Sequence, residues 1–304
     1  MRFTHGITGP LACAAVFTVV GGTAMAHDSP ADAAEMKGVT VTGPVRDEKR
    51  SVDVLTVTSP FVGKPCRIDV LLPDKLRDGK TYPVLYMLPV GGEWNAKPPW
   101  GYALAEARRA DAHNRHGVIC VLMQFDAMPW YGSHATNKKI RHEEHIRKVV
   151  VPAIEEHYPA SRRVKDRLLF GFSKSGWGAV TLLLRNADVF GAACSWDAPL
   201  CFTKKDFGKV GTRPHFGTAE QMAKYLPLTL AEQRVGELTG GPPRLMILGH
   251  SIWWNHSSQY AKHLKELGIP HVFDDSLRAK HTWTSKWLPK ALDMFLTLHA
   301  KPAK

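Results

Sequence analysis

Residues 168–179 read LLFGFSKSGWGA, an apolar run that leads through Ser173 into a segment with two glycines. The pattern predicts a buried strand, a tight turn and then a helix. A nucleophile elbow has this form, because small residues two positions before and two after the serine avoid clashes in a strained turn. Gly171 and Ser175 meet that requirement. We therefore expect the Ser173 hydroxyl to point out at a helix N-terminus, where backbone N–H groups stabilise an oxyanion.

The pentapeptide around Ser173 is G-x-S-x-S rather than G-x-S-x-G, which makes it a less specific signature. The alternative is a glycine-rich strand-to-helix turn in which the serine only caps the helix. The position of the segment, directly between a strand pattern and a helix pattern, favours the nucleophile elbow.

Strand and helix patterns alternate on both sides of this segment. Eight apolar strand patterns cover residues 52–58, 66–72, 83–88, 118–125, 167–171, 191–196, 244–248 and 271–273. Helix patterns cover residues 99–115, 141–157, 174–186, 257–267 and 284–298. This alternation is typical of an α/β fold with a mostly parallel sheet and helices on both faces. The first two strands are joined by a short turn and can pair antiparallel.

The chain is expected to form a single domain over residues 50–300, because α/β domains are commonly large. Residues 201–241 show helix patterns and no strand, so they form a helical insertion after the sixth strand. Insertions at the carboxyl ends of strands overhang the ligand site of open α/β sheets. We expect this one to act as a lid or pocket wall.

The N-terminal segment predicts export. Residues 1–26 contain an apolar stretch, end in small residues and lack acidic residues. These are the features of a cleaved secretory signal. The apolar stretch is shorter than the roughly 18 residues that span a membrane, so no stable membrane anchor is expected. The polar residues 27–49 are expected to form a flexible leader. We expect the protein in the periplasm or outside the cell.

Composition and charge narrow the class further. With 44% hydrophobic and 22% charged residues in 304, the chain is typical of a globular protein. The formal charge of +12 is spread along the chain without a nucleic-acid-binding signature, so nucleic acid is not an expected partner. Diffuse positive charge favours solubility, anionic substrates or a nearby acidic surface.

Four cysteines follow the signal, too few for a disulfide scaffold and without metal-site spacing. Buried free thiols are the main expectation, with a bridge between Cys194 and Cys201 as the alternative. The other two are Cys66 and Cys120.

A serine nucleophile needs a base, and this order of elements places the histidine after the last strand. His281 lies there, directly before the last helix pattern. A loop at that place can carry the imidazole over Ser173. With 15 histidines in the chain, a surface loop histidine is the alternative.

Four segments together resemble the esterase D-like esterases of the α/β-hydrolase superfamily, relatives of feruloyl esterases and mycolyl transferases. They are YPVLYML at 82–88 with the glycines after it, VPAIEEHY at 151–158, the elbow continuing to Phe190, and HTW at 281–283. The resemblance runs from about Val52 to Leu298. It implies an α/β-hydrolase fold and ester hydrolysis without a cofactor.

The resemblance also assigns the oxyanion hole, with one departure. Relatives carry a His-Gly pair after the third strand, whereas this chain has Pro89-Val90 before Gly91. Proline has no N–H to donate. By resemblance the hole consists of the N–H groups of Lys174 and of Gly91 or Val90.

The acid of the triad is the second departure. Relatives place it in the loop after the seventh strand, but residues 249–255 contain no carboxylate. Asp197 follows the sixth strand, from which a carboxylate can reach the same histidine, and is the expected acid. Its alternative role is a turn before Pro199. Asp274 and Asp275 are the reserve candidates.

Aromatic residues gather at the expected catalytic end of the sheet. They suit stacking on an aromatic acyl group or a sugar ring, although part of them belongs to the core. Lys174 beside the nucleophile is either solvated or favours an anionic substrate. The expected substrate contacts are Trp130, Tyr131, Trp177, Trp253 and Trp254.

No catalytic metal is expected. His142 and His145 are three residues apart in HEEH, which differs from the H-E-x-x-H zinc spacing and lacks an evident third ligand. A solvated helix face is the expected alternative.

These features together predict an exported serine esterase with Ser173, His281 and Asp197 as its triad, acting on acylated carbohydrates or aromatic esters. The same triad could transfer an acyl group or cleave a peptide bond. A protein that kept the fold and lost the chemistry, and binds ligands only, is the remaining alternative. The oligomeric state is not predicted.

Overall fold

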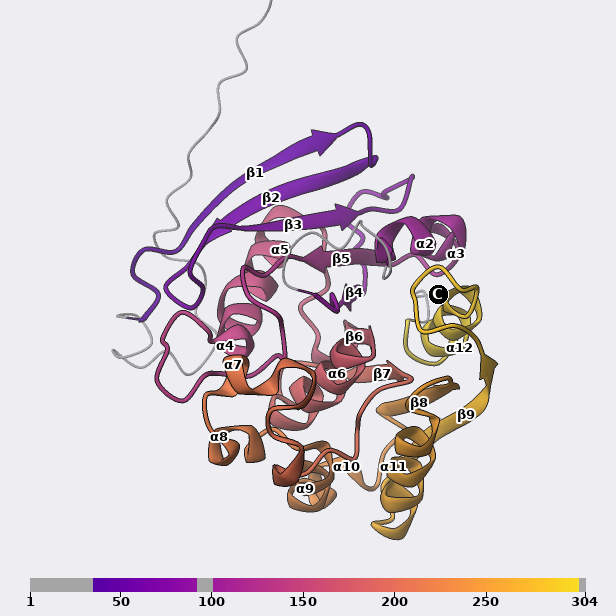
Figure 1. Cartoon of the computed structure of the whole chain (residues 1–304). Coiled ribbons are helices and arrows are strands. Elements are labelled where there is room, and N and C mark those ends of the chain that lie inside the picture. The colour runs from indigo at the N-terminus through magenta and orange to yellow at the C-terminus, as the bar shows by residue number, and fades with distance from the viewer. Residues whose placement is uncertain (1–34, 92–100, 301–304) are drawn as a thin grey trace, which may run out of the picture.

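A nine-stranded sheet runs through the part of the chain that the computed structural model describes, residues 35–91 and 101–300 (Figure 1). The strand order is β1-β2-β3-β5-β4-β6-β7-β8-β9. The strands are β1 Thr40–Asp47, β2 Val52–Thr58, β3 Cys66–Leu71, β4 Val84–Met87, β5 Ile119–Met123, β6 Arg167–Phe172, β7 Ala192–Trp196, β8 Leu245–His250 and β9 His271–Arg278.

The sheet is mostly parallel, as the sequence predicts. Strands β5, β4 and β6 to β9 pair in parallel, while β1, β2, β3 and β5 pair antiparallel. The carboxyl ends of β4 to β9 therefore meet at one edge of the sheet. The segments after these strands are the ones that carry the expected site residues.

Strand β1 corrects the expectation of a flexible leader up to residue 49. It pairs antiparallel with β2 at the edge of the sheet, with a register shift between Thr42 and Val45. Val41 is its one fully buried residue, so the apolar alternation that marks a strand in the sequence is missing. The backbone hydrogen bonds to β2, and not an apolar pattern, make this segment a strand.

Helices cover both faces of the sheet. One face carries α2 Ala103–Arg109, α3 Ala112–Arg115 and α12 Leu288–His299. The other face carries α4 His142–His145, a π-helical turn Ile146–Val150, α5 Val151–His157, α6 Lys174–Arg185 and α11 Trp254–Glu266. A 3-10 turn, Val164–Asp166, leads into β6.

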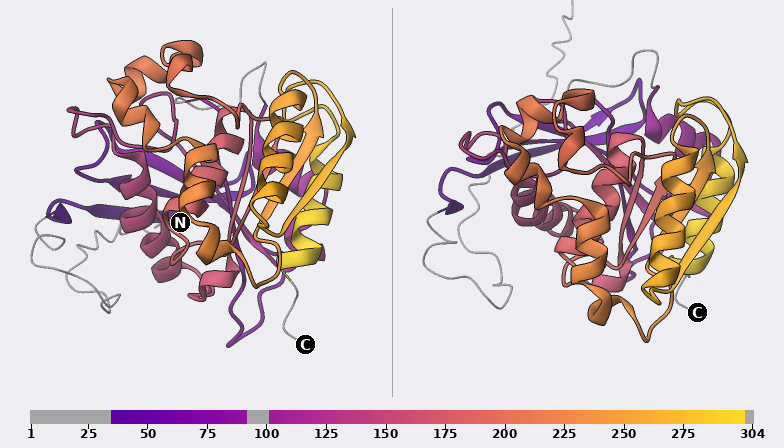
Figure 2. Two further views of the ribbon diagram at one scale, coloured as in Figure 1. Left: turned by 90° about the horizontal axis from the view of Figure 1, so that it is seen from below. Right: turned by 60° about the horizontal axis from the view of Figure 1, so that its bottom comes forward.

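The insertion after β7 is helical, as expected. Both views of Figure 2 show it in orange along one side of the molecule, next to the gold helix α11. Helix α9 packs against α6 and α11, and Phe216, Tyr225 and Leu230 are buried in the main core. The insertion is thus a packed wall. Its helices are 3-10 turns Lys204–Asp206 and Lys209–Gly211, then α7 Thr212–Phe216, α8 Ala219–Ala223, α9 Pro227–Gln233 and α10 Val235–Leu238.

The expected secretory signal at residues 1–26 and the first part of the expected leader, up to residue 34, lie outside the described ranges. Residues 92–100 also lie outside them. Within the described ranges, no helix is long and apolar enough to cross a membrane. Cys194 and Cys201 are free thiols, as are Cys66 and Cys120.

Gly178 lets helix α6 pack closely against Tyr131 in the loop after β5. A Cβ at Gly178 would lie 2.0 Å from Cδ2 of the buried Tyr131. Gly178→Ala is therefore expected to destabilise the fold by about 1–3 kcal/mol through overpacking. Gly236→Ala is the control, because its Cβ would meet nothing within 4 Å. Thermal melts of both variants check this, and equal melting temperatures would contradict it.

Candidate active site

Ser173 joins β6 to α6 in a strained turn. Its φ of 56° and ψ of −132° lie where L-residues are rarely found. Its N–H donates to the Trp196 carbonyl oxygen at 3.1 Å, and its carbonyl accepts from the Trp177 N–H at 3.1 Å. Backbone contacts to β7 and α6 thus hold the serine in this conformation. Ser173 is 6% exposed and lies at the carboxyl edge of the sheet.

Two small residues make the turn possible. A Cβ at Gly171 would lie 2.2 Å from the Ser175 carbonyl oxygen, so glycine is required there. The Ser175 hydroxyl donates to the Phe172 carbonyl oxygen at 2.8 Å and accepts from the Phe172 N–H at 3.0 Å. Serine in place of the usual glycine therefore closes the turn with its own side chain.

The structure brings His281 and Asp197 together. His281 Nδ1 lies 2.6 Å from Asp197 Oδ2. Asp197 is fully buried and directly follows β7, while His281 lies between β9 and α12. With Nδ1 facing the carboxylate, Nε2 of the ring points away from Asp197.

Three backbone N–H groups also bind the Asp197 carboxylate. They belong to Ser251, Ile252 and Trp253, at distances of 3.1, 3.1 and 2.8 Å. These residues form the loop after β8, where relatives place the acid. In this chain that loop supplies hydrogen-bond donors to an acid from β7.

The reserve acids have other surroundings. Asp274 lies on β9 and accepts a hydrogen bond from the Ser276 N–H at 2.7 Å. Hydrogen bonding by the Ser276 side chain, and then by this N–H, lowers the pKa of the Asp274 carboxyl group. Asp275 is exposed on the same strand. Among the described carboxylates, Asp197 is the one in hydrogen-bond contact with His281.

Aromatic rings fix the position of His281 over the ends of β6 and β7. The imidazole centroid lies 5.0 Å from Phe172 and 6.3 Å from Trp196. Trp196 in turn stacks on Trp287 at 4.2 Å with an interplanar angle of 6°. Phe172 ends β6 and directly precedes Ser173, so this packing places the imidazole at the end of the sheet that carries the serine.

The expected oxyanion donors come from two segments. Lys174 is the first residue of α6, so its N–H has no partner within the helix. Gly91 is the last described residue before the gap at 92–100, and Val90 before it is buried. The Pro89 carbonyl oxygen accepts a hydrogen bond from the Tyr131 hydroxyl, which ties this segment to the loop after β5.

This geometry agrees with a comparison to protein families. The model of the family described as "Putative esterase" matches residues 59–265, more than half of the chain. The chain belongs to this esterase family. It is therefore a serine hydrolase that acts on ester bonds, and the predicted family resemblance is confirmed.

Solved structures show the same fold as this esterase. A ferulic acid esterase is 19% identical with a TM-score of 0.62, covering 82% of this chain and 96% of that one. An S-formylglutathione hydrolase from Agrobacterium tumefaciens is 15% identical with a TM-score of 0.63, covering 86% and 95%. MPT51 of Mycobacterium tuberculosis is 16% identical with a TM-score of 0.63, covering 82% and 98%. The predicted α/β-hydrolase fold is confirmed. No curated protein sequence matches the chain.

Three of the expected substrate contacts in this esterase belong to the core. Trp130, Tyr131 and Trp177 are fully buried, and Trp130 packs edge-to-face on Trp177 with centroids 5.2 Å apart. The Trp130 indole N–H donates to the Val210 carbonyl oxygen at 3.2 Å, so it attaches the insertion to the core. These side chains have no surface to offer a ligand, which corrects the prediction.

The other two expected contacts follow β8. Trp253 is half-buried against Phe202, with ring centroids 5.5 Å apart. Trp254 is 49% exposed and stacks on His250 with centroids 5.1 Å apart and an interplanar angle of 5°. The exposed Ile252 lies beside them, two residues from Trp254. Trp254 therefore remains a candidate for substrate contact.

The Lys174 side chain is buried rather than solvated. The residue is 6% exposed, and its Nζ lies 2.7 Å from the Met128 thioether sulfur. Burial lowers the pKa of this ammonium group to about 8. Met128 is a neighbour of the site that the sequence did not indicate, because no local pattern marks it.

The HEEH helix also departs from expectation. His142 and His145 are fully buried, and Glu143 pairs with Arg185 at 3.0 Å. This face packs into the core instead of facing solvent. The described residues contain no group of three or more His, Cys, Asp or Glu side chains placed to hold a metal ion.

A buried histidine cluster makes the fold sensitive to acid. Burial lowers the pKa of His145 to about 4 and of His215 to about 3, and it lowers that of His142 strongly. Below pH 6.5 the unfolded chain binds protons that these folded histidines do not, so stability falls as the pH falls. Each histidine contributes up to about 1.4 kcal/mol per pH unit between pH 6.5 and its folded pKa.

The variant His142→Phe tests this pH dependence. Neither ring nitrogen of His142 has a hydrogen-bond partner in the described part of the chain, and the ring stacks on Phe125 at 4.3 Å. Phenylalanine keeps the stacking and removes the titration. Urea unfolding at pH 7.5, 6.5 and 5.5 should show a shallower loss of stability in the variant. The same slope in both proteins would refute the prediction.

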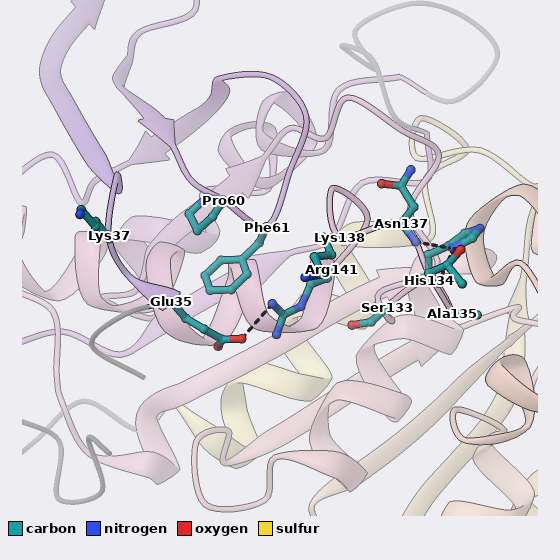
Figure 3. A pocket seen from close by; sticks show the side chains of 11 residues that line it. Glu35, Lys37, Pro60, Phe61, Ser133, His134, Ala135, Asn137, Lys138 and Arg141 are labelled. Atoms are coloured by element: carbon teal, nitrogen blue, oxygen red, sulfur yellow. Dashed lines mark hydrogen bonds and ion pairs between the residues drawn. The ribbon is translucent and has the colours of Figure 1, made fainter. Parts of the chain in front are cut away.

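Figure 3 shows a cavity of about 510 Å³ that none of Ser173, Asp197 and His281 lines. Glu35 and Arg141 line it and lie 3.0 Å apart, and Glu35 also pairs at 2.9 Å with Lys148, which does not line the cavity. These cations hold the pKa of Glu35 below its usual range. The guanidinium and the ammonium are thus already paired with a carboxylate of the chain.

Proposed function

We propose that this esterase is an exported carboxylic-ester hydrolase in which Ser173, His281 and Asp197 form the catalytic triad. The observation that carries the proposal is the contact of 2.6 Å between His281 Nδ1 and the buried Asp197 carboxylate, next to the strained Ser173. A buried carboxylate that orients an imidazole beside a serine at a helix N-terminus is the arrangement that activates a serine nucleophile.

In acylation, Ser173 Oγ attacks the ester carbonyl carbon and its proton moves to His281 Nε2. Asp197 stabilises the imidazolium that forms. The N–H groups of Lys174 and of Gly91 or Val90 donate to the negatively charged oxygen of the tetrahedral intermediate. The intermediate breaks its bond to the alkoxy oxygen, which takes the proton from His281 and leaves as the alcohol.

In deacylation, water replaces the alcohol. His281 removes a proton from the water as it attacks the acyl carbon of the Ser173 ester. The second tetrahedral intermediate collapses with release of the carboxylic acid, and Ser173 Oγ recovers its proton from His281. No cofactor takes part in these steps.

The substrate class rests on the aromatic residues at the site. The stack of Trp254 on His250 offers an exposed flat surface that suits a sugar ring or an aromatic acyl group. One of the structures that share the fold is named a ferulic acid esterase. Acylated carbohydrates and aromatic esters are therefore the proposed substrates.

Export rests on the sequence of residues 1–26, with cleavage before His27. The N-terminal sequence of the protein recovered after expression of the full chain tests it. Recovery from the periplasm or the medium with His27 at the N-terminus is expected. Uncleaved protein that stays in the cytoplasm would overturn this part of the proposal.

Ester hydrolysis by the chain from His27 tests the activity directly. Rates with p-nitrophenyl acetate and butyrate are compared with those of feruloyl and acetylated sugar esters. Faster turnover of the aromatic or sugar esters is expected. Preference for short aliphatic esters alone would reject the substrate class, and a chain that neither hydrolyses esters nor reacts with a fluorophosphonate would reject the mechanism.

A further inference from the structure

Lys174 places a cation next to the reacting serine. Its Nζ is 2.7 Å from the Met128 thioether sulfur, which is a weak acceptor. In the described ranges it makes no ion pair, and burial is the sole cause of the lowered pKa of its ammonium group. A buried ammonium group without an acidic partner is unfavourable, so this position calls for an explanation.

Two acids of the neighbouring segments are already paired with other groups, and a third, Asp126, lies against Gly63 and near Cys66 instead of Lys174. The Asp197 carboxylate accepts from His281 and from three backbone N–H groups. Asp206, in the insertion, accepts from Lys209 at 2.8 Å and from the Thr203 N–H at 2.8 Å. Neither carboxylate is available to Lys174.

The flexible Met128 side chain, which contacts the ammonium group of Lys174, reaches solvent. Met128 is 45% exposed, and Val210 beside it on the insertion is 46% exposed. A Cβ at Gly211 would lie 3.1 Å from the Met128 sulfur, so the methionine rests against the insertion. Unbranched methionine side chains change rotamer readily, and a small shift would open Nζ to a ligand at the mouth of the site.

We infer that Lys174 selects ester substrates that carry a carboxylate a few atoms from the scissile carbonyl group. The inference rests on the proposed function, because Ser173 must be the nucleophile for this distance to matter. The positive end of α6 adds to the attraction of an anion. A substrate carboxylate at Nζ would provide the missing counter-charge, and its pairing in a mostly buried place is stronger than at the surface.

Two matched pairs of esters test the inference. Mono-p-nitrophenyl glutarate and p-nitrophenyl valerate have acyl chains of equal length, and only the former ends in a carboxylate. The pair 4-acetoxybenzoate and its methyl ester places the charge on the leaving group instead. For each pair, the ratio is kcat/KM of the charged ester divided by kcat/KM of the uncharged one. We expect this ratio to exceed one for the parent protein in one of the two pairs. The pair that shows the preference identifies the half of the substrate that Lys174 contacts.

Variants of Lys174 then assign that preference. Lys174→Met should lower the ratio about tenfold or more, and Lys174→Arg should restore a large part of it. Lys205→Met removes one positive charge from the exposed surface of the insertion and should leave the ratio unchanged. Because each comparison is a ratio, a general loss of activity in a variant cancels.

A pH series on the parent needs no variant. The ratio should fall as the pH rises through about 8, where the Lys174 ammonium group loses its proton. His215, the titratable group of α7 whose pKa responds to Lys174, is neutral throughout this range because its pKa is about 3. His281 and Asp197 act on both esters alike.

The outcomes separate the two proposals. Hydrolysis of all four esters with ratios that neither Lys174→Met nor pH changes would overturn the inference and leave the esterase mechanism standing. Failure of the parent to hydrolyse any of them would overturn the proposed function and the inference together.

Discussion

Ser173→Ala should reduce ester hydrolysis by about 10⁴-fold or more, because the variant lacks the hydroxyl that we propose forms the acyl-enzyme. The fold should survive. The backbone contacts of residue 173 with Trp196 and Trp177 do not involve the hydroxyl, and alanine bears the same strain at a φ of 56° as serine does. The melting temperature is therefore expected to stay within a few degrees of the parent.

The measurement is kcat/KM with p-nitrophenyl butyrate, together with labelling by a fluorophosphonate. Ser276→Ala is the control, because Ser276 is an exposed serine on β9. It should keep full activity and labelling. A Ser173→Ala variant that still hydrolyses the ester at a tenth of the parent rate, or still takes the label, would show that the nucleophile is another residue.

Asp197→Asn should lower kcat by about 10³–10⁴-fold. The carboxylate accepts from His281 Nδ1 and three backbone N–H groups, whereas an amide has one acceptor oxygen and an NH₂ group. In either orientation of the amide, its NH₂ group faces N–H groups that hydrogen-bonded to a carboxylate oxygen in the parent. The imidazole then loses the partner that holds its tautomer, and the fold loses about 1–3 kcal/mol for each buried donor left unpaired.

Asp275→Asn is the matched control, since Asp275 is an exposed reserve candidate on β9. It should change neither kcat nor the melting temperature. Collapse of activity in Asp275→Asn or Asp274→Asn, with Asp197→Asn still active, would move the acid to β9. Circular dichroism of Asp197→Asn separates a lost orientation of His281 from a lost fold, because a variant that keeps the parent spectrum has lost activity without unfolding.

The features that the sequence predicted well are local. The elbow at Ser173 follows from Gly171 and Ser175, whose sizes are required by contacts within five residues of the chain. The parallel sheet and its covering helices follow from apolar periodicity, which is set by which face of each element is buried. Among the strands, β1 was not predicted from the sequence, because an edge strand with one buried residue shows little apolar alternation.

The features that the sequence predicted poorly depend on burial. Trp130, Tyr131 and Trp177 lie at the expected end of the sheet, but all three are buried, and Trp130 and Trp177 contact Val210 and Phe216 of the insertion. His142 and His145 look polar in the sequence, and a tertiary contact with Phe125 and Ser59 buries them. A residue type gives its chemistry but not its exposure, which depends on segments far away in the chain.

The sequence by itself determined the fold class, the family and the position of Ser173, since each depends on short-range spacing. It narrowed the acid to three carboxylates without choosing among them. Only the tertiary structure placed Asp197 against His281, because the distance between two side chains 84 residues apart depends on how β7, β8 and β9 pair. The same strand pairing places the loop after β8 beside Asp197, so that three of its N–H groups donate to the Asp197 carboxylate.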